Sequence, residues 1–201
     1  MPRIGRAWTL LGPVLPLVLA LSVVACGGSK IPLVTFDPAS PCTTDGRQPG
    51  AYPDLEAQLP THYQGIAPAS VDSGRNCTKD ALATLATAGI TGVRFAGATW
   101  NLGGTTGLTV AVFQADGLTP PEMIDFYLAG AAGSSKTDSF QTTDTTVAGR
   151  PARRLDLLQS DGSGHTIVAW PSVRSGVVNV LLATDLGDAK VRDALAEVGS
   201  G

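Results

Sequence analysis

A group of arginines in the second half of the chain has the chemistry to bind an anion. Arg150, Arg153 and Arg154 fall within five residues, and Arg174 follows in a later turn. A guanidinium group offers a planar fork of N–H donors that suits carboxylate and phosphate oxygens. The candidate anion site comprises Arg150, Arg153 and Arg174. In a strand, Arg153 and Arg154 would point to opposite faces, so the alternative is an exposed Arg154 that pairs with Asp156 on its own face.

The two histidines, His62 and His165, could act as general bases, but neither lies in a hydrolase motif. Ser-His-Asp hydrolysis needs a base beside the nucleophile and usually a Gly-x-Ser-x-Gly turn, which the chain lacks. We therefore expect both histidines at the surface and predict no catalytic residue. A hydrolase of unrecognised type would require a cleft that brings one histidine within ~3 Å of a serine and a carboxylate.

The sequence predicts neither a cofactor nor a metal site. Its glycine clusters lack the spacing of Walker and dinucleotide-binding loops. The segment 161–164, Asp-Gly-Ser-Gly, could offer oxygen ligands to calcium, but it lacks the repeated acidic positions of an EF-hand loop. We expect a plain hairpin turn there.

Residues 1–25 have the pattern of a secretory signal peptide. Arg3 and Arg6 precede an apolar run over 10–25, and no acidic residue occurs in this segment. A permanent transmembrane helix is the alternative. It would need ~20 apolar residues, whereas this run is shorter and is interrupted by prolines.

The end of this segment, Val23-Val24-Ala25-Cys26, resembles the lipobox of bacterial lipoproteins. The resemblance implies cleavage before Cys26, transfer of a diacylglyceryl group to its thiol, and acylation, typically by palmitate, of the new N-terminus. Two or three acyl chains anchor a protein stably, whereas one holds it only marginally. We therefore expect a protein anchored by lipid on the extracytoplasmic side of a bacterial cell membrane. The alternative is ordinary secretion with an unmodified cysteine.

With Cys26 assigned to lipid, Cys42 and Cys77 are the remaining cysteines of the chain. An exported, oxidising location favours a disulfide between them. A metal pair or two free thiols are the alternatives. A zinc site is disfavoured because no second cysteine pair and no histidines stand at ligand spacing.

Length and charge limit the domain organisation and the partners. The chain has 201 residues and a formal net charge of −3, which fits one domain with accessory segments. The acidic balance and few aromatic residues argue against nucleic-acid binding. We assign 1–25 to the signal, 26–54 to a lipid-anchored, Pro/Gly-rich tether with a disulfide-tied end, and 55–201 to a single domain.

Hydrophobic patterning beyond Pro60 predicts alternating strands and helices. We expect strands over 65–71, 93–100, 108–115, 140–147, 151–158, 165–170 and 177–184, and helices over 79–88, 120–131 and 188–198. Thr119 and Glu122 have the spacing of a capping box at the start of the second helix. Tyr127 lies on the apolar stripe of that helix and is expected in the core.

Short glycine-containing turns between the last four strands predict hairpins, because a parallel return needs a dozen or more residues. The fold class is therefore α+β, with an antiparallel sheet of six to seven strands and two to three helices packed on it. The 147–154 hairpin, Val-Ala-Gly-Arg-Pro-Ala-Arg-Arg, together with Trp170 and the Thr184-Asp185 step, resembles small bacterial lipoproteins with a Mog1/PsbP-like α+β sandwich. This resemblance covers residues 55–198 and implies a fold but no activity.

These observations favour a non-catalytic binding or interaction module of the cell envelope, whose partner is an envelope protein or a small ligand. One alternative is a small-ligand or lipid-binding protein with a pocket between sheet and helices, lined by Trp100, Trp170 and Tyr127. The other is the hydrolase considered above.

Replacing the lipid-bearing thiol tests the anchor. We expect Cys26→Ala to release the protein from the membrane fraction without unfolding it, because the acyl chains would provide the attachment. Cell fractionation and the intact mass of the membrane-extracted protein measure this. Cys42→Ala is the matched control and should stay in the membrane fraction. A Cys26→Ala protein that remains membrane-bound would contradict the assignment.

Overall fold

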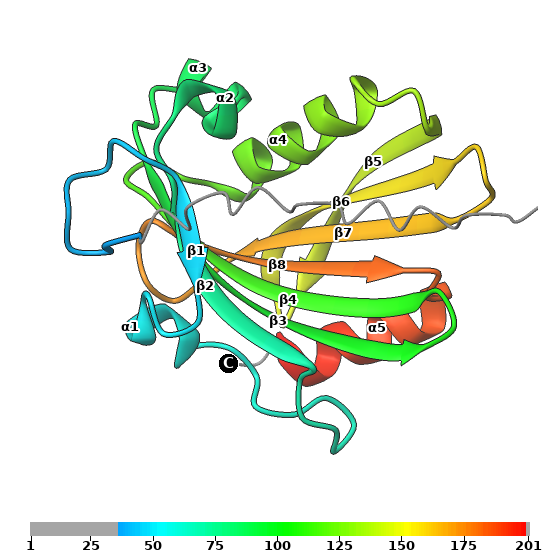
Figure 1. Ribbon diagram of the computed structural model, residues 1–201. Coiled ribbons are helices and arrows are strands. Elements are labelled where there is room, and N and C mark those ends of the chain that lie inside the picture. Colours follow the sequence, from blue (N-terminus) through cyan, green and yellow to red (C-terminus); the bar gives the residue numbers. More distant parts are fainter. Residues whose placement is uncertain (1–35, 200–201) are drawn as a thin grey trace, which may run out of the picture. The chain divides into compact units, whose positions relative to one another are not determined.

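The computed structural model describes residues 36–199, whose centre is one antiparallel sheet of eight strands (Figure 1). The strand order is β1-β2-β3-β4-β8-β7-β6-β5, so two meanders meet where β4 pairs with β8. The strands are β1 Gly46–Gln48, β2 Ser70–Asn76, β3 Val93–Gly103, β4 Thr106–Gln114, β5 Thr137–Val147, β6 Arg150–Gln159, β7 Gly164–Pro171 and β8 Val177–Thr184. This arrangement confirms the α+β class and the antiparallel sheet.

The helices lie on both sides of the sheet. They are α1 Pro53–Glu56, α2 Lys79–Leu82, α3 Thr84–Thr87, α4 Pro120–Ala132 and α5 Asp188–Val198. Figure 1 shows α4 above one side of the sheet and α5 on the other. Helix α4 also carries the chain from β4, near the middle of the sheet, to β5 at its edge.

Each face of the sheet supports its own hydrophobic core. On the side of α1 and α5, Trp100 and Trp170 are buried with Val191 of α5. On the other side, Met123 and Ile124 of α4 are fully buried against strands β6 to β8. Alternate residues of a strand face opposite sides, so a strand between two cores must be apolar throughout. The sequence of β8 meets this requirement almost completely.

The counts of elements were underestimated. The expected six to seven strands and two to three helices become eight strands and five helices among residues 36–199. Strand β1 was missed because it lies in the Pro/Gly-rich segment, where it pairs with β2. Since β1 belongs to the sheet and Tyr52 is buried, the folded part extends into the segment 36–54 that was assigned to the tether.

Two helices begin where expected but differ in detail. The helix expected over 79–88 is divided into α2 and α3 at Ala83, whose φ of 46° is left-handed, and no glycine or proline marks this break. Thr119 is the N-cap residue of α4, but its side chain makes no capping hydrogen bond. Within the described residues, Glu122 Oε2 is buried without a hydrogen-bond partner, so the capping box does not form.

Polar contacts and a cysteine pair fasten the segment before β1 to the end of β2. Cys42 and Cys77 lie at disulfide-bonding distance, with Cα atoms 5.3 Å apart, in agreement with the predicted pairing. The buried Arg75 side chain donates hydrogen bonds to the carbonyl oxygens of Ser40 and Thr44. Asp45 accepts hydrogen bonds from the backbone N–H groups of Cys77 and Thr78. Burial raises the pKa of the Asp45 carboxyl, but the hydrogen bonds outweigh burial and hold this pKa below its ordinary value.

Several expectations fall on residues that the structure does not describe. The signal expected over 1–25 and the lipid attachment expected at Cys26 lie outside the described part. Within residues 36–199, no helix has the length and apolar character that a membrane crossing requires.

The cysteine pair generates a stability prediction. We expect Cys42→Ala to lower the free energy of unfolding by up to ~4 kcal/mol, because the bridge closes a loop with a sequence separation of 35 and so restricts the unfolded chain. Thermal unfolding under non-reducing conditions measures the change, and Cys77→Ala should give the same loss. Reductant should destabilise the native protein but leave the Cys42→Ala variant unchanged; equal melting temperatures for all forms would argue against the bridge.

Candidate functional site

The strongest candidate site is a cavity of about 460 Å³ between the C-terminal half of α4 and the sheet, which we call the α4 pocket. Its floor is formed by β6, β7 and β8 through Leu157, Ile167 and Leu182. Phe126 and Tyr127 of α4 form the opposite wall. Ligand sites in proteins typically have volumes of this order and a mostly apolar lining.

Small residues in the rest of the α4 pocket lining explain why side chains do not fill the cavity. Small side chains line it where helices meet, namely Ala81 and Ala83 around α2, and Gly130 and Ala131 of α4.

The ring of Phe126 packs edge-on to Tyr127 at 5.5 Å between centroids. Burial raises the pKa of Tyr127 to about 12, so its hydroxyl stays protonated at physiological pH. Tyr127 therefore presents a neutral donor beside an apolar surface.

A polar group lies at the β6–β7 side of this pocket. Gln159 Nε2 is 2.7 Å from His165 Nε2, and His165 Nδ1 is 3.1 Å from Thr184 Oγ1. Because both ring nitrogens of His165 lie within hydrogen-bonding distance of these neighbours, the imidazole has a fixed orientation beside the apolar floor of the pocket.

The aromatic residues expected to line a pocket separate into two groups. Tyr127 lines the α4 pocket, whereas Trp100 and Trp170 are each 1% exposed and belong to the core on the opposite face of the sheet. The indole N–H of Trp100 donates to the carbonyl oxygen of Ile66 at 2.9 Å. A pocket between sheet and helices is thus present, but the three aromatic residues do not line it together: Tyr127 borders the α4 pocket, and Trp170 borders a cavity on the opposite face.

The three arginines of the candidate anion site lie in different surroundings. Arg150 donates hydrogen bonds to the carbonyl oxygens of Pro171 and Gly199. Arg153 pairs with Asp144, which stands opposite it on β5, at 2.7 Å. Arg174 lies exposed in the turn between β7 and β8. Because Arg150 and Arg153 already bind oxygens of this chain, the geometry does not join the three guanidinium groups into one anion site.

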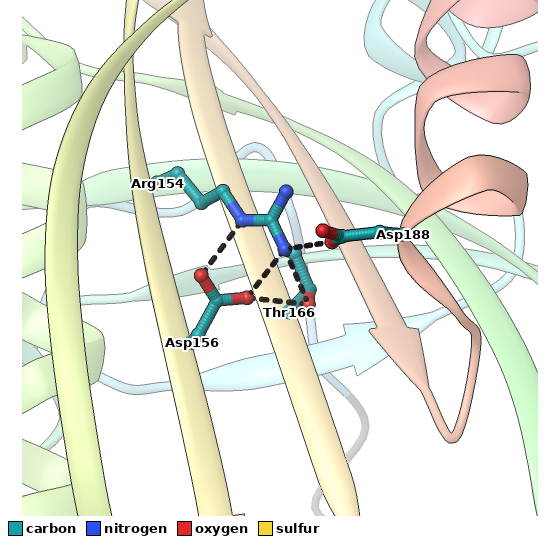
Figure 2. A network of polar contacts seen from close by, with 4 residues as sticks. All are labelled: Arg154, Asp156, Thr166 and Asp188. Carbon is teal, nitrogen blue, oxygen red and sulfur yellow. Dashed lines mark hydrogen bonds and ion pairs between the residues drawn. The ribbon is translucent and has the colours of Figure 1, made fainter.

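Arg154 instead holds α5 on the sheet (Figure 2). Its guanidinium bonds both carboxylate oxygens of Asp156, at 2.7 and 2.8 Å, and also pairs with Asp188 in the first turn of α5. Thr166 on β7 donates to Asp156 at 2.7 Å. The alternative reading, an Arg154–Asp156 pair on one strand face, is confirmed, but Arg154 is half-buried and not exposed. Hydrogen bonding to Asp156, which outweighs burial, raises the pKa of Arg154, and Arg154 in turn lowers the pKa of Asp188.

Neither histidine has the surroundings of a hydrolytic base. His62 is exposed, as expected, and its Nδ1 lies 3.2 Å from Thr61 Oγ1. His165 was expected at the surface but is half-buried, and its hydrogen-bond partners are an amide and a threonine hydroxyl. Among residues 36–199 no serine or carboxylate hydrogen-bonds to either imidazole. This geometry gives the hydrolase alternative no support.

The Asp161 loop is a hairpin turn between β6 and β7. Asp161 Oδ1 accepts hydrogen bonds from the backbone N–H and the hydroxyl of Ser163, which lower the pKa of this carboxyl. Its carboxylate is therefore occupied by the turn itself. The described part of the chain also contains no group of three or more His, Cys, Asp or Glu side chains that could hold a metal ion.

Two residues with site chemistry were missed in the sequence. His165 was assigned to the surface because it follows a glycine-rich turn, but its position on β7, two residues before the buried Ile167, indicates the same strand face. Asn179 interrupts the otherwise apolar run of β8 and is half-buried. A polar residue inside an otherwise apolar central strand is the signal that could have identified this position.

The fold and the cavity define an α+β sandwich domain with a ligand-sized pocket between a helix and the sheet. No model of a known protein family matches this chain, and a search of curated proteins found no match either. Function must therefore be argued from the geometry of the site.

The Arg154 network makes the stability of the domain dependent on pH. Because Arg154 lowers the pKa of Asp188 below its ordinary value of 3.8, this carboxylate adds stability that is fully present above that value. The contribution is lost as the pH falls through the lower, folded-state pKa. We expect Asp188→Asn to destabilise the protein near neutral pH and to flatten the acid limb of its stability profile.

Chemical denaturation at neutral and acid pH measures this effect. Asp144→Asn is the matched control, because the Asp144 side chain is 82% exposed in its pair with Arg153. Exposed ion pairs contribute ~0–1 kcal/mol to the free energy of unfolding, so Asp144→Asn should keep the pH dependence of stability of the native protein. Identical profiles for Asp188→Asn and the native protein would contradict the role of the network.

Proposed function

We propose that this chain is a lipid-anchored protein of the bacterial cell envelope whose domain binds a small apolar molecule in the α4 pocket. The sequence supports the anchor through the signal over 1–25 and the lipobox that ends at Cys26. The α4 pocket supports the binding function, and it is the observation that carries the proposal. Catalysis is not part of this function.

The chemistry of the α4 pocket favours a ligand with an apolar body and one hydrogen-bonding group. Phe126, Leu157 and Ile167 offer apolar surface, whose burial against a ligand contributes ~25 cal/mol per Å² before the costs of association. The imidazole of His165 and the amide of Gln159 would orient the polar group. No arginine or lysine lines the cavity, so a strongly anionic ligand is disfavoured.

A second candidate function is binding of an envelope protein at the edge of the sheet. β5 is an outer strand of the sheet, and Phe140 on it is 51% exposed. Leu158 on the neighbouring β6 is 43% exposed. An outer strand offers backbone groups to a partner strand, and exposed apolar side chains would add contact area.

Filling the α4 pocket tests the proposal. A Cβ atom at Gly130 would meet nothing within 4 Å, so Gly130→Leu should place a side chain at the cavity without a clash. We expect this change to weaken binding of the neutral fluorescent probe N-phenyl-1-naphthylamine by about tenfold or more. It should also stabilise α4 by up to ~1 kcal/mol, because leucine has the higher helix propensity. A loss of binding could therefore not be attributed to unfolding.

The measurement is a fluorescence titration in the Cys26→Ala background, so that no detergent competes for the probe. Ala129→Leu is the matched control, since Ala129 is an exposed neighbour on α4 that does not line the pocket. It should bind the probe like the parent protein. Equal probe binding by Gly130→Leu and the parent would reject the α4 pocket as the binding site.

A further inference from the structure

A second cavity, of about 300 Å³, lies on the opposite face of the sheet, and we call it the Asn179 pocket. Trp170 of β7, Val110 of β4 and Val198 of α5 give it apolar walls. Gln58 and Pro60, which follow α1, and the 172–174 turn complete its boundary. It is therefore formed where α1, α5 and the β7–β8 turn leave part of the sheet uncovered.

Asn179 is an unusual residue for this position. It stands opposite Trp170 on β7 and Val112 on β4, in the middle of the sheet. Its neighbours on the same face of β8, Val177 and Leu181, are buried and apolar. Within residues 36–199 the amide of Asn179 has no hydrogen-bond partner, although it is half-buried. Its amide atoms are not fully buried, so water reaches them in the cavity, and a bound ligand would take the place of that water.

Arg174 supplies the charge of the Asn179 pocket. Arg174 lines the cavity, and within the part of the chain that is described its guanidinium group forms no ion pair or hydrogen bond. Its backbone N–H donates to Ser172 Oγ at 3.4 Å, which shapes the turn around the pocket. No aspartate or glutamate lines the cavity, so the charge of Arg174 is not balanced there.

The walls of the Asn179 pocket are held together by Arg150. This guanidinium donates to the carbonyl oxygen of Pro171, next to the β7–β8 turn, and to that of Gly199, next to Val198 of α5. It therefore joins two segments that border the cavity. Gly176 fixes the turn from the other end: its φ is +70°, and a Cβ there would lie 2.8 Å from the carbonyl oxygen of Ala115. A pocket whose walls are fixed in advance binds with a smaller ordering cost.

We propose that the Asn179 pocket binds a small molecule that carries one carboxylate on an apolar body. The guanidinium fork of Arg174 pairs with the carboxylate, since both groups are planar and match in geometry. The amide of Asn179 makes a second hydrogen bond, and the apolar body packs on Val173 and Val198. A single arginine suits a monoanion, and the volume, at the low end for ligand pockets, suits a molecule the size of an aromatic acid. This site is separate from the α4 pocket, since the sheet lies between them.

Phenylacetate and its neutral isostere phenylacetamide test the proposal on the full chain by titration calorimetry. The native protein should bind phenylacetate at millimolar concentration or below, and phenylacetamide about tenfold more weakly, because the amide has no charge to pair with Arg174. Arg174→Gln should weaken phenylacetate binding about tenfold and remove the preference between the two probes. Asn179→Leu, which keeps the side-chain volume, should weaken both.

Arg192→Gln is the matched control, because Arg192 is an exposed arginine of α5 that does not line the Asn179 pocket. It should bind both probes like the native protein. The proposal is overturned if phenylacetate does not bind, if it binds no better than phenylacetamide, or if Arg174→Gln leaves its affinity unchanged. Preferential binding of phenyl phosphate over phenylacetate would also overturn the carboxylate assignment. N-Phenyl-1-naphthylamine binding should not change in Arg174→Gln, so the two pockets are tested separately.

Discussion

The central strands β7 and β8 are buried on both faces, and the rest of the domain follows from this constraint. In β8, Val178 and Val180 face α4 while Val177 and Leu181 face the side of α1 and α5. If either set were exposed, the folded state would lose about 1.5–3 kcal/mol of stabilisation for each large side chain. The sheet must therefore be covered from both sides. One cover is provided by the α4 connection between the two meanders, and the other by the helix that follows the last strand.

The few short helices cover each face of the sheet incompletely, and both cavities arise from that geometry. Eight strands spaced ~4.8 Å apart form a sheet roughly 34 Å wide, whereas a helix with its side chains is only ~10–12 Å across. The 13 residues of α4 extend ~20 Å, and small residues at its C-terminal end leave space above β6 to β8. On the other face, the Asn179 pocket is bordered by the residues that follow the short α1 and by Val198 near the end of α5. Both cavities thus occur where the covering helices leave part of the sheet open.

Elements that are signalled by the local sequence were predicted well, whereas features that depend on tertiary contacts were missed. The last four strands and α5 were predicted within a few residues, because alternation, glycine turns and an amphipathic stripe are local signals. The break at Ala83 and the absent side-chain cap at Thr119 have no such signal; the surrounding packing decides them. The sequence also indicated a pocket between sheet and helices, but Trp100 and Trp170 cannot be assigned to one face without the strand register.

The arginines show why residue type alone did not locate a site. Within the 150–154 hairpin, Arg153 and Arg154 point to opposite faces and are each neutralised by aspartates, so their charge stabilises strand pairing and the docking of α5. Arg150 binds only backbone carbonyl oxygens in the described chain, and its contribution is to fix the segments around the Asn179 pocket. Arg174 differs because its turn holds it away from carboxylates. A guanidinium group becomes available to a ligand only where the fold supplies no internal anion, and the pairing of strands determines where that occurs.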